Sequence, residues 1–240
     1  MSRPGPGPKR GPIVAIDGPA GVGKSTVGRR LARALGVPFI STGLMYRAVA
    51  GAALSSGIDP GEDAALGRVA GAMEFDLTPD GGPRQLTIGG ALPGPALEST
   101  EVEAVVSEVA AHGTVRAVLR AAQRRLGEQG CVMEGRDIAS VVFPDADVKI
   151  HLEGHPEVRA GRRKTERGGG AAVADAIAGR DALDAKTTPP IPVPGAARID
   201  TTGLDEDQVY EAVLRIVRGP IPGASPLPQA ATGPPEETVR

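Results

Sequence analysis

The sequence has few aromatic residues, one cysteine, and neither tryptophan nor asparagine. Aromatic side chains make up 2% of the 240 residues, so the core must be built from Ala, Val, Leu and Ile. That composition is typical of parallel sheets buried beneath helices. The single cysteine, Cys131, excludes an internal disulfide and fits a reducing compartment. The net charge of −2 gives no global electrostatic case for binding nucleic acid or an anionic membrane.

Long apolar runs are also missing. No stretch approaches the roughly 20 apolar residues that a helix needs to cross a bilayer. Residues 1–12 are dominated by Pro, Gly and basic residues, unlike the apolar segment of a secretory signal. We therefore expect a soluble, cytoplasmic monomer that binds neither nucleic acid nor membrane. Residues 1–11 and 219–240 lack periodicity and are rich in Pro and Gly, which predicts disordered tails around a domain at 12–218.

Short apolar runs alternate with helical patterns inside this domain. The predicted strands are 13–17, 39–40, 131–134, 148–152 and 197–200. The predicted helices are 24–35, 44–55, 62–72, 101–111, 114–126, one that begins at Pro156, and 206–217. This alternation predicts an α/β fold in which helices flank both faces of a parallel five-stranded sheet. Residues 72–98 break the pattern: runs at 73–77 and 85–88, with a third at 91–92, predict a small antiparallel insert.

A phosphate-binding pattern follows the first predicted strand. Gly18, Gly23, Lys24 and Ser25 match G-x-x-x-x-G-K-[ST], with an amphipathic helix directly after it. Glycines let backbone N–H groups surround a phosphate, and the helix N-terminus adds a positive dipole. Lys24 would reach the β- and γ-phosphate oxygens, and the Ser25 hydroxyl would bind Mg²⁺, the expected cofactor. The residues expected to bind ATP are Gly18, Pro19, Ala20, Gly21, Val22, Gly23, Lys24, Ser25 and Thr26.

The identity of the phosphate acceptor needs other evidence. A chain without asparagine has no Asn-Lys-x-Asp motif for reading guanine, and this one is too short for a motor core with a partner domain. A kinase with a small acceptor is therefore favoured. Arg47 and Arg136 follow the second and third strands of the sheet, at the edge where ligands bind in open α/β folds. We expect the two guanidinium groups to clamp one acceptor phosphate.

Several runs of the sequence resemble the bacterial cytidylate kinase family. They are Asp17–Ser25, Thr42–Arg47, Gly135–Ile138, Val141–Ile150 and Asp200–Leu204, and the resemblance covers about residues 13–218. It implies a P-loop nucleoside monophosphate kinase fold with a monophosphate-binding insert at 72–98 and a helical lid at 156–185. It also implies transfer of the γ-phosphoryl group of ATP to CMP or dCMP in pyrimidine nucleotide metabolism.

The resemblance further implies individual roles. Thr42, Tyr46, Arg47, Arg136 and Asp137 would hold the acceptor, Ser107 and Arg116 would read cytosine, and Arg180 with Asp184 would lie near the sugar. Ser107 and Arg116 are not neighbours on one straight helix, but a break at His112-Gly113 would let them converge. Glu134 would hold Mg²⁺ through water. The expected catalytic residues are Lys24, Arg136, Arg162 and Arg163.

The lid prediction depends on basic residues that follow the fourth strand of the sheet. Arg159, Arg162, Arg163, Lys164 and Arg167 precede three consecutive glycines at 168–170, which suggests a hinged segment that closes over the phosphates. No general base is expected, because an acceptor phosphate is already ionised at neutral pH. Catalysis would consist of positioning and charge neutralisation.

The chain departs from the family pattern in three places. The family typically carries Asp-Ser-x-Arg where this chain reads Asp184-Ala185-Lys186-Thr187, so the base-contacting arginine is missing. The lid is short, and Glu98 stands where a basic residue is common. Two alternatives therefore stay open: a kinase with relaxed preference among pyrimidine monophosphates, and a nucleotide-binding regulator with weak transfer activity.

Overall fold

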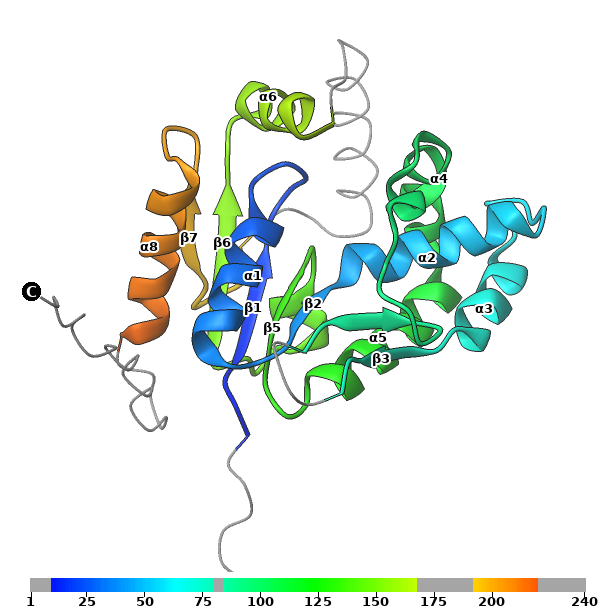
Figure 1. Ribbon diagram of the computed structural model, residues 1–240, viewed down its shortest axis with the longest axis horizontal. Coiled ribbons are helices and arrows are strands. Elements are labelled where there is room, and N and C mark those ends of the chain that lie inside the picture. The colour runs from blue at the N-terminus through cyan, green and yellow to red at the C-terminus, as the bar shows by residue number, and fades with distance from the viewer. Residues whose placement is uncertain (1–9, 80–83, 168–191, 220–240) are drawn as a thin grey trace, which may run out of the picture.

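The computed structural model describes residues 10–79, 84–167 and 192–219, with only the backbone for 163–167 (Figure 1). Most of the predicted tails, residues 80–83 of the predicted insert and the lid residues after Arg167 lie outside this range. Arg10 and Gly11, which the sequence assigns to a tail, are described. Arg10 pairs with Asp147 at 2.7 Å, and the Gly11 N–H donates to the carbonyl oxygen of Gln129 at 2.9 Å.

A parallel five-stranded sheet forms the centre of the fold, as predicted. Its strands are β1 (Ile13–Asp17), β2 (Phe39–Ser41), β5 (Cys131–Gly135), β6 (Val148–Glu153) and β7 (Ala197–Asp200), in the order β2-β5-β1-β6-β7. Every residue of β1 is buried, because this central strand is covered on both faces. The strand can be buried throughout because its sequence, Ile-Val-Ala-Ile-Asp, carries a polar side chain only at its last position.

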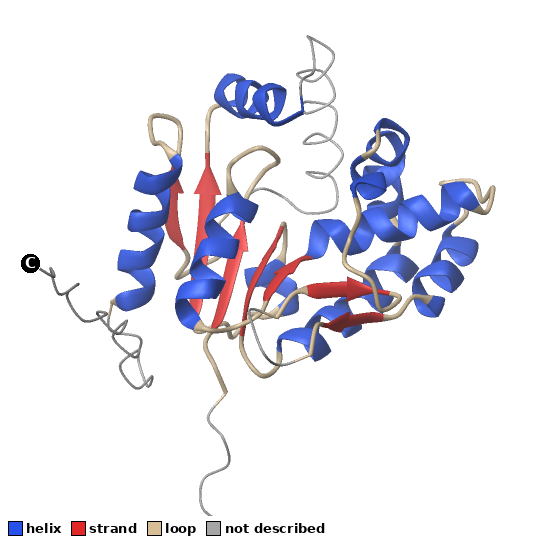
Figure 2. Ribbon diagram, viewed as in Figure 1, coloured by secondary structure: helices blue, strands red, loops and turns tan. Residues whose placement is uncertain are grey.

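Helices cover both faces of the sheet (Figure 2). Val14 and Ile16 point to the face covered by α1 (Lys24–Leu35) and α8 (Glu206–Arg218). Ile13 and Ala15 point to the opposite face, where the helices α2 (Thr42–Ser55), α3 (Asp63–Ala72), α4 (Thr100–Ala111) and α5 (Gly113–Gly127) pack. Helix α6 (Pro156–Arg167) follows β6 and lies beyond the carboxyl edge of the sheet (Figure 1). No helix in the described ranges is both long and apolar enough to cross a membrane.

The predicted insert contains an antiparallel pair, β3 (Phe75–Leu77) and β4 (Leu86–Ile88). The third strand predicted at 91–92 is wrong: only an isolated bridge joins Ala91 to Ile88. Gly89 and Gly90, at φ of +58° and +78°, turn the chain straight back, and the Leu92 that follows is 55% exposed. A 3₁₀ turn, η1 (Pro95–Glu98), then leads into α4.

The carboxyl ends of β1, β2 and β5 meet at one edge of the sheet. Each strand continues there into a segment with predicted functional residues: the glycine-rich loop after β1, the start of α2 after β2, and Arg136-Asp137 after β5. A short π-helical turn, η2 (Ile138–Val142), follows Arg136-Asp137. The fold therefore brings Arg136 beside Gly18, which lies 118 residues earlier in the chain.

Candidate active site

The loop between β1 and α1 has a backbone at its two ends that strongly favours glycine. Gly18 has φ of +151°, and a Cβ there would lie 2.3 Å from the carbonyl oxygen of Leu152 on β6. Gly23 is left-handed at φ of +93° and caps α1 without any side-chain hydrogen bond to the first turn. A glycine cap leaves room beside the first turn, where a phosphate can approach the backbone N–H groups of a helix N-terminus.

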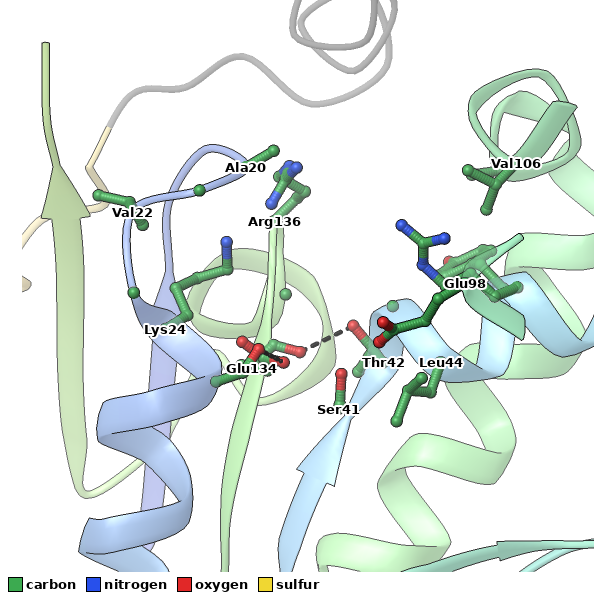
Figure 3. Close-up of a pocket in the computed structure, with 18 of the residues that line it drawn as sticks. Ala20, Val22, Lys24, Ser41, Thr42, Leu44, Glu98, Val106, Glu134 and Arg136 are labelled. Carbon is green, nitrogen blue, oxygen red and sulfur yellow. Dashed lines mark hydrogen bonds between the residues drawn. The ribbon is translucent and has the colours of Figure 1, made fainter. Parts of the chain in front are cut away.

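Carbonyl oxygens of this loop accept hydrogen bonds from three basic side chains. Lys24 Nζ donates to the oxygens of Gly18 and Pro19, at 2.8 and 2.7 Å. Arg136 Nη1 donates to the same Gly18 oxygen at 2.7 Å. Arg159 Nη1 donates to the oxygen of Ala20 at 3.1 Å. Lys24 points into the space beside the loop, and Arg136 lies close to Ala20 (Figure 3).

A cavity of about 460 Å³ lies between the loop and the helices of the opposite wall. The predicted ATP-binding residues from Ala20 to Thr26 all line it, while Gly18 and Pro19 accept the bonds of Lys24, which also lines it. Glu98 and Val106 stand on the far wall (Figure 3). The lining also includes these predicted acceptor and metal residues: Thr42, Tyr46, Arg47, Ser107, Arg116, Glu134, Arg136 and Asp137.

The break between α4 and α5 brings the two predicted base-reading residues to one cavity. Helix α4 ends at Ala111 and α5 begins at Gly113, with His112 between them. The His112 ring lies 2.8 Å from the Pro60 carbonyl oxygen, which anchors the corner. Ser107 and Arg116 consequently both line the cavity although they belong to different helices.

The cations of the far wall are held by acidic side chains. Arg47 pairs with Glu103 of α4 and donates to the carbonyl oxygen of Leu97 at 3.2 Å. Arg116 Nη2 donates to Asp137 Oδ2 at 2.6 Å. These pairs fix the guanidinium groups against the wall, because each is bonded to a carboxylate from another element.

Tyr46 is held as a neutral phenol. Burial raises its pKa to about 12, and its hydroxyl is within hydrogen-bonding distance of the Gln123 side chain on α5. At neutral pH this hydroxyl is therefore both a donor and an acceptor, and it is no candidate for a general base.

Ser25 and Glu134 form an oxygen-rich pair at the start of α1. Ser25 Oγ donates to Glu134 Oε1 at 2.6 Å, and Thr42 Oγ1 donates to the backbone oxygen of Glu134 at 2.8 Å. A hydroxyl and a carboxylate beside the phosphate loop are the hard ligands that Mg²⁺ takes together with water and substrate phosphates. The residues present therefore fit a magnesium ion.

The predicted lid residues divide into three groups. Arg159 is 6% exposed and braces the loop through Ala20 and the Gly154 oxygen, at 3.1 and 3.0 Å. Arg162 bonds to Thr201 Oγ1, to the Thr201 carbonyl oxygen and to the Leu204 carbonyl oxygen, and it does not line the cavity. The third group lies outside the described residues and consists of the side chains of Arg163, Lys164 and Arg167 with the whole of Arg180 and Asp184; Thr187, beyond the predicted lid, is also outside them.

Sequence reasoning missed the partners that hold the site residues in place. Arg120 Nη2 lies 3.4 Å from Asp137, and Arg124 donates to the carbonyl oxygens of Val141 and Val142. Their four-residue spacing from Arg116 puts all three arginines on one face of α5, which is the signal that would have found them. Asp17 and Glu103 offered no comparable signal.

A five-stranded parallel sheet with a P-loop after its central strand, facing a second cationic wall, defines a P-loop kinase. Residues 14–219 match the family model described as cytidylate kinase. The chain belongs to the cytidylate kinase family.

Individual relatives agree with this assignment. The cytidylate kinase of Mycobacterium avium is 41% identical over 219 residues, which cover 86% of this chain and 95% of that protein. The cytidylate kinase of Streptomyces avermitilis is 39% identical over 212 residues, covering 85% and 92%. A bifunctional pantoate ligase/cytidylate kinase of Synechococcus is 43% identical over 220 residues, covering 87% of this chain but only 45% of that protein. The chain thus spans about half the length of the bifunctional relatives.

Proposed function

We propose that this protein transfers the γ-phosphoryl group of ATP to CMP or dCMP and releases the corresponding diphosphate. The observation that carries the proposal is the shared cavity of about 460 Å³. One wall is the P-loop with Lys24, the other carries Arg47 and Arg116, and Arg136 lies beside the P-loop where β5 ends (Figure 3), so two anionic groups can be held facing one another. A kinase that transfers a phosphoryl group from one nucleotide to another needs this arrangement.

On the donor side, the P-loop would bind the phosphates of ATP. Its backbone N–H groups and the N-terminus of α1 would surround the β-phosphate. Lys24, now bonded to two loop carbonyls, is close enough to exchange them for phosphate oxygens. Ser25 and Glu134 would hold Mg²⁺, directly and through water respectively. When bound, Mg²⁺ would neutralise charge on the phosphate oxygens of the donor.

On the acceptor side, the proposed roles follow from chemistry and position. Arg47 and Arg136 would bind the phosphate of CMP, with Thr42, Tyr46 and Asp137 beside them. Ser107 and Arg116 would read the edge of cytosine, which offers an amino donor at N4 and acceptors at N3 and O2. The attacking phosphate oxygen is already ionised, so the protein orients it and neutralises charge without removing a proton.

We also propose that 156–185 is a lid and that 72–98 supports the acceptor wall. Arg162 and Arg163 would then assist transfer, which requires Arg162 to exchange its bonds at Thr201 and Leu204 for phosphate oxygens. Of the described residues in 72–98, Glu98 alone lines the cavity. Arg125 of α5 donates to the Phe75 carbonyl oxygen, so the insert would act by bracing α5 rather than by touching the nucleotide.

A coupled assay of ADP release against CMP, dCMP, UMP and AMP tests the proposal. We expect ADP release that depends on CMP or dCMP and exceeds the release with ATP alone. Equal rates with UMP and CMP would instead show relaxed specificity. ATP binding without acceptor-dependent ADP would show a regulator. Thr187→Arg is a useful comparison variant, because it supplies the arginine that the family carries near this position.

A further inference from the structure

Asp17 is a buried carboxylate that has no role in the mechanism above. It is the last residue of β1, directly before the P-loop, and it is 6% exposed. Its two oxygens accept backbone N–H bonds from Ile138 at 2.9 Å and from Ala139 at 2.8 Å. Those N–H groups belong to η2, the turn that directly follows Arg136 and Asp137. Asp17 therefore ties the strand that carries the P-loop to the segment that carries an acceptor cation.

A second bond joins the same two segments in the opposite direction. Arg136 Nη1 donates to the backbone oxygen of Gly18, the residue after Asp17, at 2.7 Å. The side chain of residue 17 thus holds the backbone of 138 and 139, and the side chain of residue 136 holds the backbone of 18. The strands β1 and β5 are hydrogen-bonded neighbours with Asp17 opposite Gly135, so both bonds lie at the point where the strands end.

The carboxylate is confined to this position by its surroundings. Burial raises the pKa of Asp17, and the hydrogen bonds from Ala139 and Ile138 oppose that rise. A buried polar group is tolerated when its hydrogen bonds are made and is costly when they are lost. The backbone of Gly18 beside it lies close to β6, since a Cβ at this position would be 2.3 Å from the Leu152 carbonyl oxygen. The two segments are therefore joined by hydrogen bonds in both directions.

We propose that Asp17 is a positioning residue that sets the separation between the donor P-loop and the acceptor cation Arg136. This rests on the proposed function, because it assumes that both phosphates bind in the one cavity. In-line transfer is sensitive to such a separation: a misplacement of about 1 Å can lower the rate by on the order of 10²-fold. Asp17 would act on the transfer step while contacting neither phosphate.

The other end of β1 supplies a matched control. Asp147 Oδ2 accepts the backbone N–H of Ile13 at 2.8 Å and pairs with Arg10. Like Asp17, it is an aspartate connected to β1, but at the amino end of the strand, and it does not line the cavity. Asp147→Asn therefore reports the cost of loosening β1 without altering the distance between the P-loop and Arg136.

The test compares Asp17→Asn with Asp147→Asn by steady-state kinetics. Asn keeps the size of Asp but places an amino group against one of the two N–H donors. We expect Asp17→Asn to lower kcat about 10- to 100-fold, with the KM values for ATP and CMP changed less than about threefold. Asp147→Asn should keep kcat within about threefold of the wild type at a temperature where both variants are folded.

Three results would overturn the proposal. They are an unchanged kcat in folded Asp17→Asn, a loss of kcat/KM that comes wholly from higher KM values, and an equal loss of kcat in Asp147→Asn. Asp17→Ser, which keeps one acceptor oxygen, serves if the Asn variant does not fold. Failure of the proposed function looks different, because the wild type would then release no ADP with CMP. If the panel reveals another acceptor, the comparison is made with that acceptor.

Discussion

Replacing Glu103 by Gln removes the negative charge that faces Arg47 and keeps the shape of the side chain. Arg47 is the acceptor-wall cation whose side chain is 6% exposed, and Glu103 is 21% exposed. If Glu103 holds Arg47 ready for the acceptor phosphate, the variant binds CMP more weakly. If Glu103 competes with that phosphate for the guanidinium group, the variant binds CMP more tightly. The sign of the change therefore separates the two roles.

The structure favours the holding role and indicates how large the change in CMP binding should be. Breaking a fully buried ion pair costs about 3–5 kcal/mol. Glu103 is partly exposed and the glutamine that replaces it would still accept one hydrogen bond, while the Leu97 carbonyl continues to bind Arg47. We therefore expect the variant to lose about 1–2 kcal/mol of binding free energy for CMP. Since about 1.4 kcal/mol is a tenfold change, the KM for CMP should rise about 5- to 30-fold.

The assay varies CMP at saturating ATP and follows ADP release. Glu101→Gln is the control, because Glu101 lies on the same helix but is exposed to solvent. Thermal unfolding of both variants shows whether α4 stays packed. A KM for CMP that falls in Glu103→Gln, or one that rises equally in Glu101→Gln, would refute the holding role.

Three further changes test the supports of the site. Gly18→Ala should lower the free energy of unfolding by about 3 kcal/mol in urea, because its Cβ would strike the Leu152 carbonyl at a φ of +151°; an unaffected midpoint would contradict this. Arg159→Met should raise the KM for ATP about tenfold and leave that for CMP unchanged, because it removes the brace on the P-loop; equal effects on both would count against it. Burial alone would raise the pKa of Asp147, but hydrogen bonds from Arg10 and the β1 backbone outweigh it and lower the pKa. Its stabilisation is thus present above the unfolded value of about 3.9 and is lost as the pH falls through the folded value. Asp147→Asn should therefore cost about 1 kcal/mol at pH 7 and progressively less below about pH 4, as equilibrium unfolding at several pH values would show.

The elements nearest the P-loop could be predicted from the sequence because their signals are local. β1 is an unbroken apolar run, and Gly36 ends α1 in the left-handed conformation that favours glycine. The convergence of Ser107 and Arg116 was predictable for the same reason, since the break at His112-Gly113 can be read from the chain. The prediction of a strand at 91–92 was wrong because the two glycines before this apolar pair turn the chain back.

The pairings inside the site could not be predicted in the same way. Glu103 lies 56 residues from Arg47, and Asp17 lies 121 residues from Ile138. Each of these contacts depends on how whole helices and strands pack, and the local sequence around either partner does not encode the other. Arg162 illustrates the limit: its position among basic residues favoured a lid, while its actual partners lie at 201–204, beyond the next strand.

Four of the cations that line the cavity, Lys24, Arg47, Arg116 and Arg136, are held by acceptors of different charge. Lys24 and Arg136 donate to the neutral Gly18 carbonyl, whereas Arg47 and Arg116 donate to carboxylates. A carboxylate attracts a guanidinium or ammonium group more strongly than a neutral carbonyl does, because both partners then carry a full charge. Exchanging a carbonyl for a phosphate oxygen is therefore favourable, while exchanging a carboxylate for a phosphate is close to neutral. We infer that Lys24 and Arg136 transfer their bonds to the reacting phosphates, whereas Arg47 would bind the acceptor phosphate, and Arg116 the base, while each is still paired with its carboxylate.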